Sequence, residues 1–466
     1  MRRLKPVLLL TILGVSSGTI VPQLQSILGT EVARQIAERA MFRTEKSLDL
    51  IQAMIVYAVW HLKHRETKAP GFSQYIHSAA VMAMEIGLGN RLRASLAKSR
   101  EEEAEMRRTW LTCYYATISY KYSEEDSLTN HSVSVILHHP PLIRFSPYID
   151  ECLKFFSEGP APAATDLTLC SLIRLTQITE DVSLLFHLDD PTATISIDDP
   201  RTQYLLKFLN TRLEEWKVDA AGHMNSDILE HSFKVTRLLT HEVALRYDYN
   251  ADPSSTARIF TAAHFDALAT CVGSISRILD SFIHMDLRMY RVVECPYMTW
   301  TLYATIAMIR LSGILRLPAP KLTDMLLPES KLEHYLNTVI LKFTSLSQMD
   351  ANPSAESFLH AFQRLRSWNN QKSTGSSIPL VMNEIRAGIC ETKSSDKENT
   401  ETGQSTHAAT LLHVSETQSD KFLGSREPLF DPSSLVDDPP FDTESWNATA
   451  ENLGNLDPFN LGIWFE

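Results

Sequence analysis

Two pairs of neighbouring carboxylates come closest, by residue type and spacing, to a metal site. Asp189-Asp190 and Asp198-Asp199 carry oxygen atoms of the kind that hold magnesium. A helical magnesium site needs acids at positions i, i+1 and i+4 of one helix face, but residue 193 is Ala and Pro191 interrupts the segment. We therefore interpret both pairs as parts of a solvated loop.

The histidines also fall short of a metal-binding pattern. His241-Glu242 begins like the zinc-binding helix His-Glu-x-x-His, but the second histidine would be residue 245, which is Leu. His138-His139 has no acid nearby at the spacing of metal ligands. The sequence also contains no phosphate-binding loop, no dinucleotide glycine pattern and no Gly-x-Ser-x-Gly motif. It thus predicts no catalytic residue, no cofactor-binding residue and no metal ligand, and we expect that the chain is not an enzyme.

The composition is that of a globular protein, and the charge argues against binding of nucleic acid over a broad face. The chain has 466 residues, of which 44% are hydrophobic and 21% charged, and its formal net charge is −12. Binding a phosphate backbone needs clustered Lys and Arg, and this sequence has no such stripe. The cysteines are too scattered for a metal knuckle or a disulfide framework, so we expect reduced, mostly buried thiols of an intracellular protein. They are Cys113, Cys152, Cys170, Cys271, Cys295 and Cys390.

The elements that must position these side chains are helices. Residues 101–122 change from an acidic and basic start, with Arg107 and Arg108, to an apolar and aromatic end that begins at Trp110. This pattern predicts a helix that runs from solvent into a core. Residues 45–62 are apolar on all sides after Asp49, which indicates a central helix. Further helices are expected near residues 23–42, 74–88, 167–187, 202–217, 227–247, 257–285, 297–315, 329–347 and 354–369.

Strand patterns are nearly absent, and the composition changes towards the C-terminus. The sequence therefore predicts an all-α fold with a helical domain over residues 1–385. Residues 386–426 are polar and rich in Ser and Thr, which is typical of a disordered linker. Residues 427–466 contain nine acidic residues, no Lys and no Arg. Aromatic residues are interleaved with these acids, namely Phe430, Phe441, Trp446, Phe459, Trp464 and Phe465.

Two interpretations of this acidic-aromatic tail stay open. Acidic residues keep a segment extended and solvated while its aromatic residues remain accessible to a groove of a partner, which is typical of an activation segment. Alternatively, the tail folds back onto the helical domain. The N-terminus is equally ambiguous, because its basic start and apolar run over residues 1–18 have the pattern of a secretory signal peptide.

Six segments, read in order, carry a resemblance to a known family. They are Pro6–Ser17 (PVLLLTILGVSS), Leu24–Leu28 (LQSIL), Glu45–Ala53 (EKSLDLIQA), His77–Leu88 (HSAAVMAMEIGL), Glu105–Trp110 (EMRRTW) and Phe233–Leu245 (FKVTRLLTHEVAL). Their order resembles the middle regulatory domain of fungal zinc binuclear-cluster transcription factors, over roughly residues 5–320. The residues that match the family signature are Glu105, Arg107, Arg108, Trp110, His241 and Glu242.

The resemblance implies a nuclear transcriptional regulator built on a large multi-helix domain. It implies that the apolar N-terminal run is a buried interior helix, that Arg107 and Arg108 form ion pairs within the domain, and that the tail contacts the transcription machinery or a co-activator. A small-molecule effector and a homodimer also follow from it, whereas a membrane role does not. The alternatives are an all-helical enzyme such as a terpene cyclase and a secreted helical protein.

This sequence departs from the family pattern at the cysteines of the DNA-binding module. Such factors carry six clustered cysteines, in a repeated Cys-x2-Cys-x6-Cys pattern, that bind two zinc ions and place a helix in the major groove. The scattered cysteines here do not form this cluster, so we expect no zinc and no other cofactor in this chain. Contact with DNA is expected only if a zinc cluster precedes Met1. Target genes, effector and direction of regulation are not encoded in any recognisable pattern.

Overall fold

The computed structural model describes residues 3–60, 72–119, 141–159, 163–188, 195–223, 227–245, 261–287, 289–291, 295–316, 329–349 and 353–372. Within these ranges every regular element is a helix and none is a strand, which confirms the predicted all-α fold. The linker and the tail, with Phe430, Phe441, Trp446, Phe459, Trp464 and Phe465, lie outside the described residues. The expectations for those segments therefore stay predictions.

The helices expected from hydrophobic periodicity are present, with ends that differ by a few residues. Two helices, α5 and α7, were not predicted. The α-helices that carry the fold are α1 (Pro6–Ile20), α2 (Pro22–Ile36), α3 (Leu48–Val59), α4 (Phe72–Glu85), α5 (Arg91–Ala94), α6 (Arg100–Ser119), α7 (Pro147–Ser157), α8 (Ala164–Leu185), α9 (Pro200–Asp219), α10 (Asp227–His241), α11 (Ala262–His284), α12 (Cys295–Arg316), α14 (Glu329–Met349) and α15 (Pro353–Lys372).

The first helix is fastened by a carboxylate from the third. α1 begins at Pro6, whose missing N–H suits a first helical turn. Asp49 in α3 accepts hydrogen bonds from the backbone N–H groups of Val7 and Leu8, at 3.3 and 2.8 Å. Asp49 is buried, and Arg39 lies 3.4 Å from its carboxylate. Because α1 also packs against α2 and α3, the apolar N-terminal run forms an interior helix, as expected.

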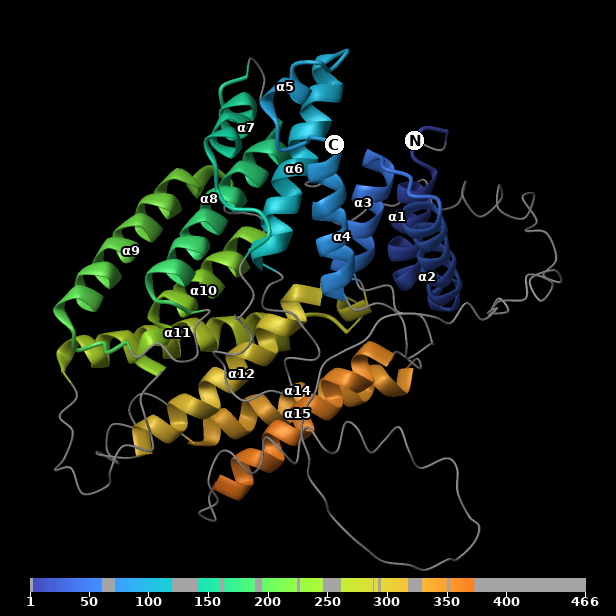
Figure 1. The fold of residues 1–466 in the computed structure, drawn as a ribbon. Helices are drawn as coiled ribbons and strands as arrows, with labels where there is room; N and C mark the ends of the chain where they lie inside the picture. The colour runs from blue at the N-terminus through green and yellow to red at the C-terminus, as the bar shows by residue number, and fades with distance from the viewer. Residues whose placement is uncertain are drawn as a thin grey trace, which may run out of the picture. The chain divides into compact units, whose positions relative to one another are not determined.

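α3 is the central helix that its all-round apolar pattern predicts. Ser47 caps it by accepting a hydrogen bond from the backbone N–H of Leu50 at 3.2 Å. Every residue from Asp49 to Val59 is buried. α3 contacts α1 and α2 on one side and α4 and α6 on the other, so it joins the N-terminal helices to those that follow (Figure 1).

The turn after α4 depends on two glycines. Gly87 has φ +80°, a left-handed conformation that ends α4 at little cost only for a residue without a Cβ. The N–H of Leu88 then donates to the carbonyl of Ala83 at 2.9 Å. Gly89 lies against the indole of Trp110, and a Cβ at Gly89 would come within 2.7 Å of that ring. The close approach of this turn to α6 thus requires glycine.

The remaining helices pack on one another in chain order. α6 contacts α4, α7 and α8, while α10 contacts α8, α9 and α11 (Figure 1). α11 in turn packs on α12 and α14, and α14 on α15. Buried apolar side chains form one continuous core from Val7 in α1 to Leu365 in α15. The four cysteines whose side chains the structure describes, Cys113, Cys152, Cys170 and Cys271, are buried free thiols, as the sequence predicts.

Candidate functional site

Arg107, in the middle of α6, makes its side-chain contacts within the helical domain. Its guanidinium donates to Glu103, one helical turn earlier, at 2.7 and 2.9 Å. It also lies 3.6 Å from the thiol of Cys152 and 4.7 Å above the ring centre of Phe155, both in α7. Burial opposes the charge of Arg107, but the hydrogen bond with Glu103 keeps its pKa above the ordinary value. Arg107 therefore holds α7 against α6 and faces no solvent groove.

Arg108 fastens α6 to α8. Its Nε and one terminal nitrogen donate to the two carboxylate oxygens of Asp166, at 2.6 and 2.9 Å. Asp166 lies in the first turn of α8, where the positive end of the helix dipole favours a carboxylate. The ring of Phe156 lies 5.3 Å from the guanidinium carbon and covers the pair. This two-pronged ion pair joins residues 58 positions apart in the chain.

Glu105 and Trp110 complete this part of the family signature. The amide of Gln52 in α3 donates to Glu105 at 3.0 Å and to Thr109 at 2.9 Å. Lys5 contacts the Glu105 carboxylate, and Trp110 covers Gly89 as described above. Glu105 thus pairs with Lys5 and not with either arginine. All four residues act as connections between helices.

His241 and Glu242 lie at the other end of the signature, where α10 ends. The helix tightens there into the 3₁₀ turn Glu242–Leu245, in which Glu242 is fully buried. Nδ1 of His241 lies 2.9 Å from the carbonyl oxygen of Arg237, so this nitrogen carries the proton. Nε2 is then the acceptor for the Asn210 amide in α9, at 3.2 Å. Burial lowers the pKa of His241 to about 4, so its ring is neutral near pH 7.

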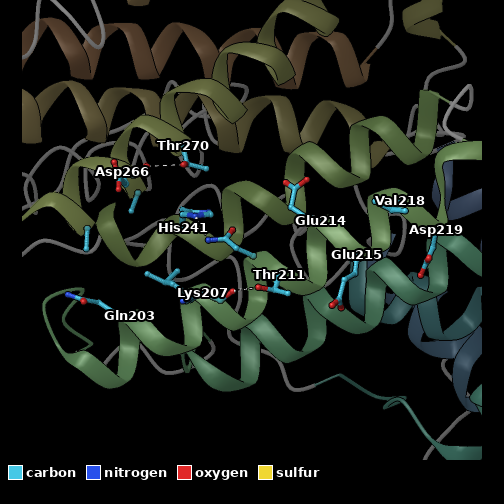
Figure 2. Close-up of a pocket in the computed structure, with 14 residues that line it drawn as sticks. Gln203, Lys207, Thr211, Glu214, Glu215, Val218, Asp219, His241, Asp266 and Thr270 are labelled. Carbon is cyan, nitrogen blue, oxygen red and sulfur yellow. Dashed lines mark hydrogen bonds between the residues drawn. The ribbon is translucent and has the colours of Figure 1, made fainter.

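His241 forms part of the floor of a groove that the sequence did not reveal. The groove has a volume of about 950 Å³ and is formed by α9 and α11, with His241 of α10 between them (Figure 2). We call it the α9–α11 groove. Its lining residues are Gln203, Leu206, Lys207, Asn210, Thr211, Glu214, Glu215, Val218, Asp219, His241, Ala263, Asp266, Ala267 and Thr270.

The charges of the α9–α11 groove are unbalanced. Four carboxylates, Glu214, Glu215, Asp219 and Asp266, line the groove together with a single lysine, Lys207 (Figure 2). No salt bridge joins any of these four carboxylates to another residue in the described ranges. Because the His241 ring is neutral, it does not offset them. The lining residues of the groove therefore carry an excess of negative formal charge.

The carboxylate pair that the structure describes has structural partners. Asp199 caps α9 by accepting from the backbone N–H of Arg201 at 3.3 Å, and Asp198 accepts from the Thr261 hydroxyl at 2.7 Å. Asp189-Asp190 and His138-His139 lie outside the described residues. Within the described ranges, no group of three or more His, Cys, Asp or Glu side chains could hold a metal ion. No described helix has the length and apolar character needed to cross a membrane.

Comparison with known proteins finds a domain match in the N-terminal part of the chain and three similar proteins. Residues 15–218 match the Fungal specific transcription factor domain. The transcription factor pbcR of Emericella nidulans is 27% identical over 394 residues, which are 79% of this chain and 48% of that protein. The transcription factor opdL of Penicillium oxalicum is 21% identical over 314 residues, 62% of this chain and 51% of that protein. The transcription factor himD of Aspergillus japonicus is 23% identical over 381 residues, 78% of this chain and 60% of that protein.

The chain thus spans about half the length of these curated relatives. No solved structure matches it significantly. The matched residues 15–218 include α6 with its paired arginines and all of α9 except its last residue, Asp219, and they end before α10. His241, Glu242 and the α11 side of the groove therefore lie beyond the matched domain.

Proposed function

We propose that this chain is the regulatory part of a transcription factor of the fungal zinc-cluster type, because residues 15–218 match the Fungal specific transcription factor domain. The observation that carries the proposal is this match, together with three relatives that are each named a transcription factor. We include no catalytic step in the proposal. The contacts of Arg107 and Arg108 support a framework role for the family signature, because both guanidinium groups bind carboxylates within the domain.

In this proposal the helical domain over residues 1–385 controls the acidic-aromatic tail over residues 427–466. The tail contacts the transcription machinery or a co-activator through its aromatic side chains, while its nine carboxylates keep it in solvent. A small-molecule effector changes activity only if it binds the restrained and released states with different affinities. DNA contact requires a zinc cluster that precedes Met1, and the site of action is the nucleus.

The experiment that tests this proposal is a reporter assay with a foreign DNA-binding domain. Residues 427–466 fused to that domain should raise transcription above the domain alone. The full chain, fused in the same way, should activate less strongly if its helices restrain the tail. Changing Trp446, Trp464 and Phe465 to Ala together should abolish activation by the tail, because the aromatic anchors are lost while the charge is kept.

Two results would refute the proposal. If neither the tail nor the full chain raised transcription, the tail would not be an activation segment. If the triple alanine variant activated as strongly as the natural tail, acidity alone would be responsible and the aromatic anchors would have no role. Fluorescent tagging of the full chain in a fungal host tests the nuclear site separately.

A further inference from the structure

The α9–α11 groove is long and open. It follows α9 from Gln203 to Asp219, which at 1.5 Å per residue is about 24 Å. Its volume of about 950 Å³ is near the upper end for small-ligand pockets. A pocket for a small molecule encloses most of its ligand, whereas α9 leaves Thr211, Glu214 and Val218 exposed along this groove. The shape therefore suits an elongated ligand better than a compact one.

Apolar side chains line the groove and continue beside it. Leu206 and Ala267 are buried in its wall, and Val218 is 75% exposed at one end. Tyr204 and Phe208, four residues apart on the adjoining face of α9, are 71% and 45% exposed. Exposed aromatic and aliphatic side chains in a row on one helix are the usual anchors for a partner helix.

The excess negative charge of the groove favours a positively charged ligand. Four carboxylates and one lysine give the lining a net charge of about −3 near neutral pH. This charge repels the chain's own tail, which has nine acidic residues between Glu427 and Glu466 and no basic residue. A ligand with Lys or Arg beside apolar residues would neutralise the carboxylates and cover the apolar anchors at once.

We propose that the α9–α11 groove docks a basic amphipathic helix of a partner protein. A helix of about 16 residues spans the groove from Gln203 to Asp219. Its apolar face lies on Leu206, Val218 and Ala267, and its basic side chains meet Glu214 and Asp219. The neutral pair of His241 and Asn210 in the floor adds no positive charge that would oppose it. This inference rests on the groove alone and not on the activity of the tail.

The test uses the full chain and a fluorescent peptide of about 18 residues, with Leu at positions i, i+3, i+4 and i+7 and Lys at the flanking positions. Fluorescence anisotropy at 50 and 300 mM salt measures its affinity. Glu214→Lys should weaken binding about fivefold at low salt, and Val218→Ser about tenfold. Glu333→Lys is the matched control, because Glu333 is an exposed acid of α14 away from the groove. It should leave affinity unchanged.

Binding of other ligands distinguishes a basic amphipathic helix from the alternative occupants of the groove. A scrambled peptide of the same composition should bind at least tenfold more weakly, since it lacks the apolar stripe. Equal binding of the scrambled peptide, or equal loss with Glu333→Lys, would reduce the effect to general attraction by an acidic protein and overturn the proposal. Saturable binding of a residue 427–466 peptide, or of the small cation spermine, that is lost with Glu214→Lys would assign the groove to that ligand instead. A chain that activates the reporter but does not bind the helix peptide would overturn this inference alone.

Discussion

The ion pair between Arg108 and Asp166 should be one of the strongest polar connections in the helical domain. Its side chains are 16% and 9% exposed, and two hydrogen bonds join them at 2.6 and 2.9 Å. Changing Arg108 to Ala leaves the Asp166 carboxylate largely buried and without its cation. Removing one partner of a buried pair costs about 3–5 kcal/mol. Because Arg108 is partly exposed, we expect a free energy of unfolding lower by about 2–4 kcal/mol.

A double-mutant cycle separates the pair from its packing. Arg108→Met with Asp166→Leu removes both charges and keeps much of the volume beside Phe156, so it should recover most of the stability that either single change loses. Arg34→Ala is the control, because Arg34 is 58% exposed and pairs with Glu31 at the surface. That change should cost about 0.5 kcal/mol or less.

Urea unfolding followed by far-ultraviolet circular dichroism measures these differences. The Arg108→Ala midpoint should fall by up to about 1 M, while the Arg34→Ala midpoint should stay close to that of the natural protein. A change for Arg108→Ala no larger than that for Arg34→Ala would refute the argument. It would mean that the α6–α8 packing is independent of the ion pair.

Three further predictions concern stability. Gly89→Ala should lower the free energy of unfolding by about 1–3 kcal/mol, because its Cβ would come within 2.7 Å of the Trp110 ring; thermal melting checks this. Asp49→Ala should cost about 1–2 kcal/mol, because two N–H groups at the start of α1 lose their acceptor, and hydrogen exchange should rise first in α1. Burial lowers the pKa of His231 to about 3, so its unfolded form gains a proton as pH falls below about 6.5 while the folded form stays neutral. Through this group, the free energy of unfolding should therefore fall by about 2 kcal/mol between pH 7 and 5. Urea titrations at both pH values should show a fall that is smaller by this amount in His231→Phe. An equal fall in His231→Phe and the natural protein would refute the burial argument.

Much of the fold was predictable because its helices carry strong local signals. The all-round apolar character of α3 indicated its central place, and the switch at Trp110 marked the point at which α6 enters the core. α7 was not predicted, although Ser146-Pro147 and Asp150 in the first turn are a helix-start signal. Its short length and the preceding Pro-rich segment obscured that signal. The helix predicted over residues 227–247 proved to end at His241, where the backbone tightens into a 3₁₀ turn.

The site was less predictable than the fold because it depends on contacts between distant residues. Periodicity placed Glu103 one turn from Arg107, and that pair is present. No local pattern indicated that Arg108 would meet Asp166, 58 residues later. The α9–α11 groove is hidden for the same reason, since α9 and α11 supply its walls and α10 supplies His241. Tyr204 and Phe208, four residues apart in the sequence, could have drawn attention to it, and both are exposed in the structure.

The α6–α8 ion pair and the α9–α11 groove should respond differently to substitution, although α8 packs against α9. The Trp216 indole in α9 donates to the Ser171 carbonyl in α8 at 2.7 Å and stacks on Phe233 of α10 at 5.6 Å. These contacts fix α9 from its buried side, whereas Glu214 lies exposed on the groove side (Figure 2). Arg108→Ala should therefore lower stability without changing helix-peptide affinity at temperatures where the chain stays folded, and Glu214→Lys should do the reverse. Loss of both properties in Arg108→Ala would mean that the groove exists only when the α6–α8 connection is intact.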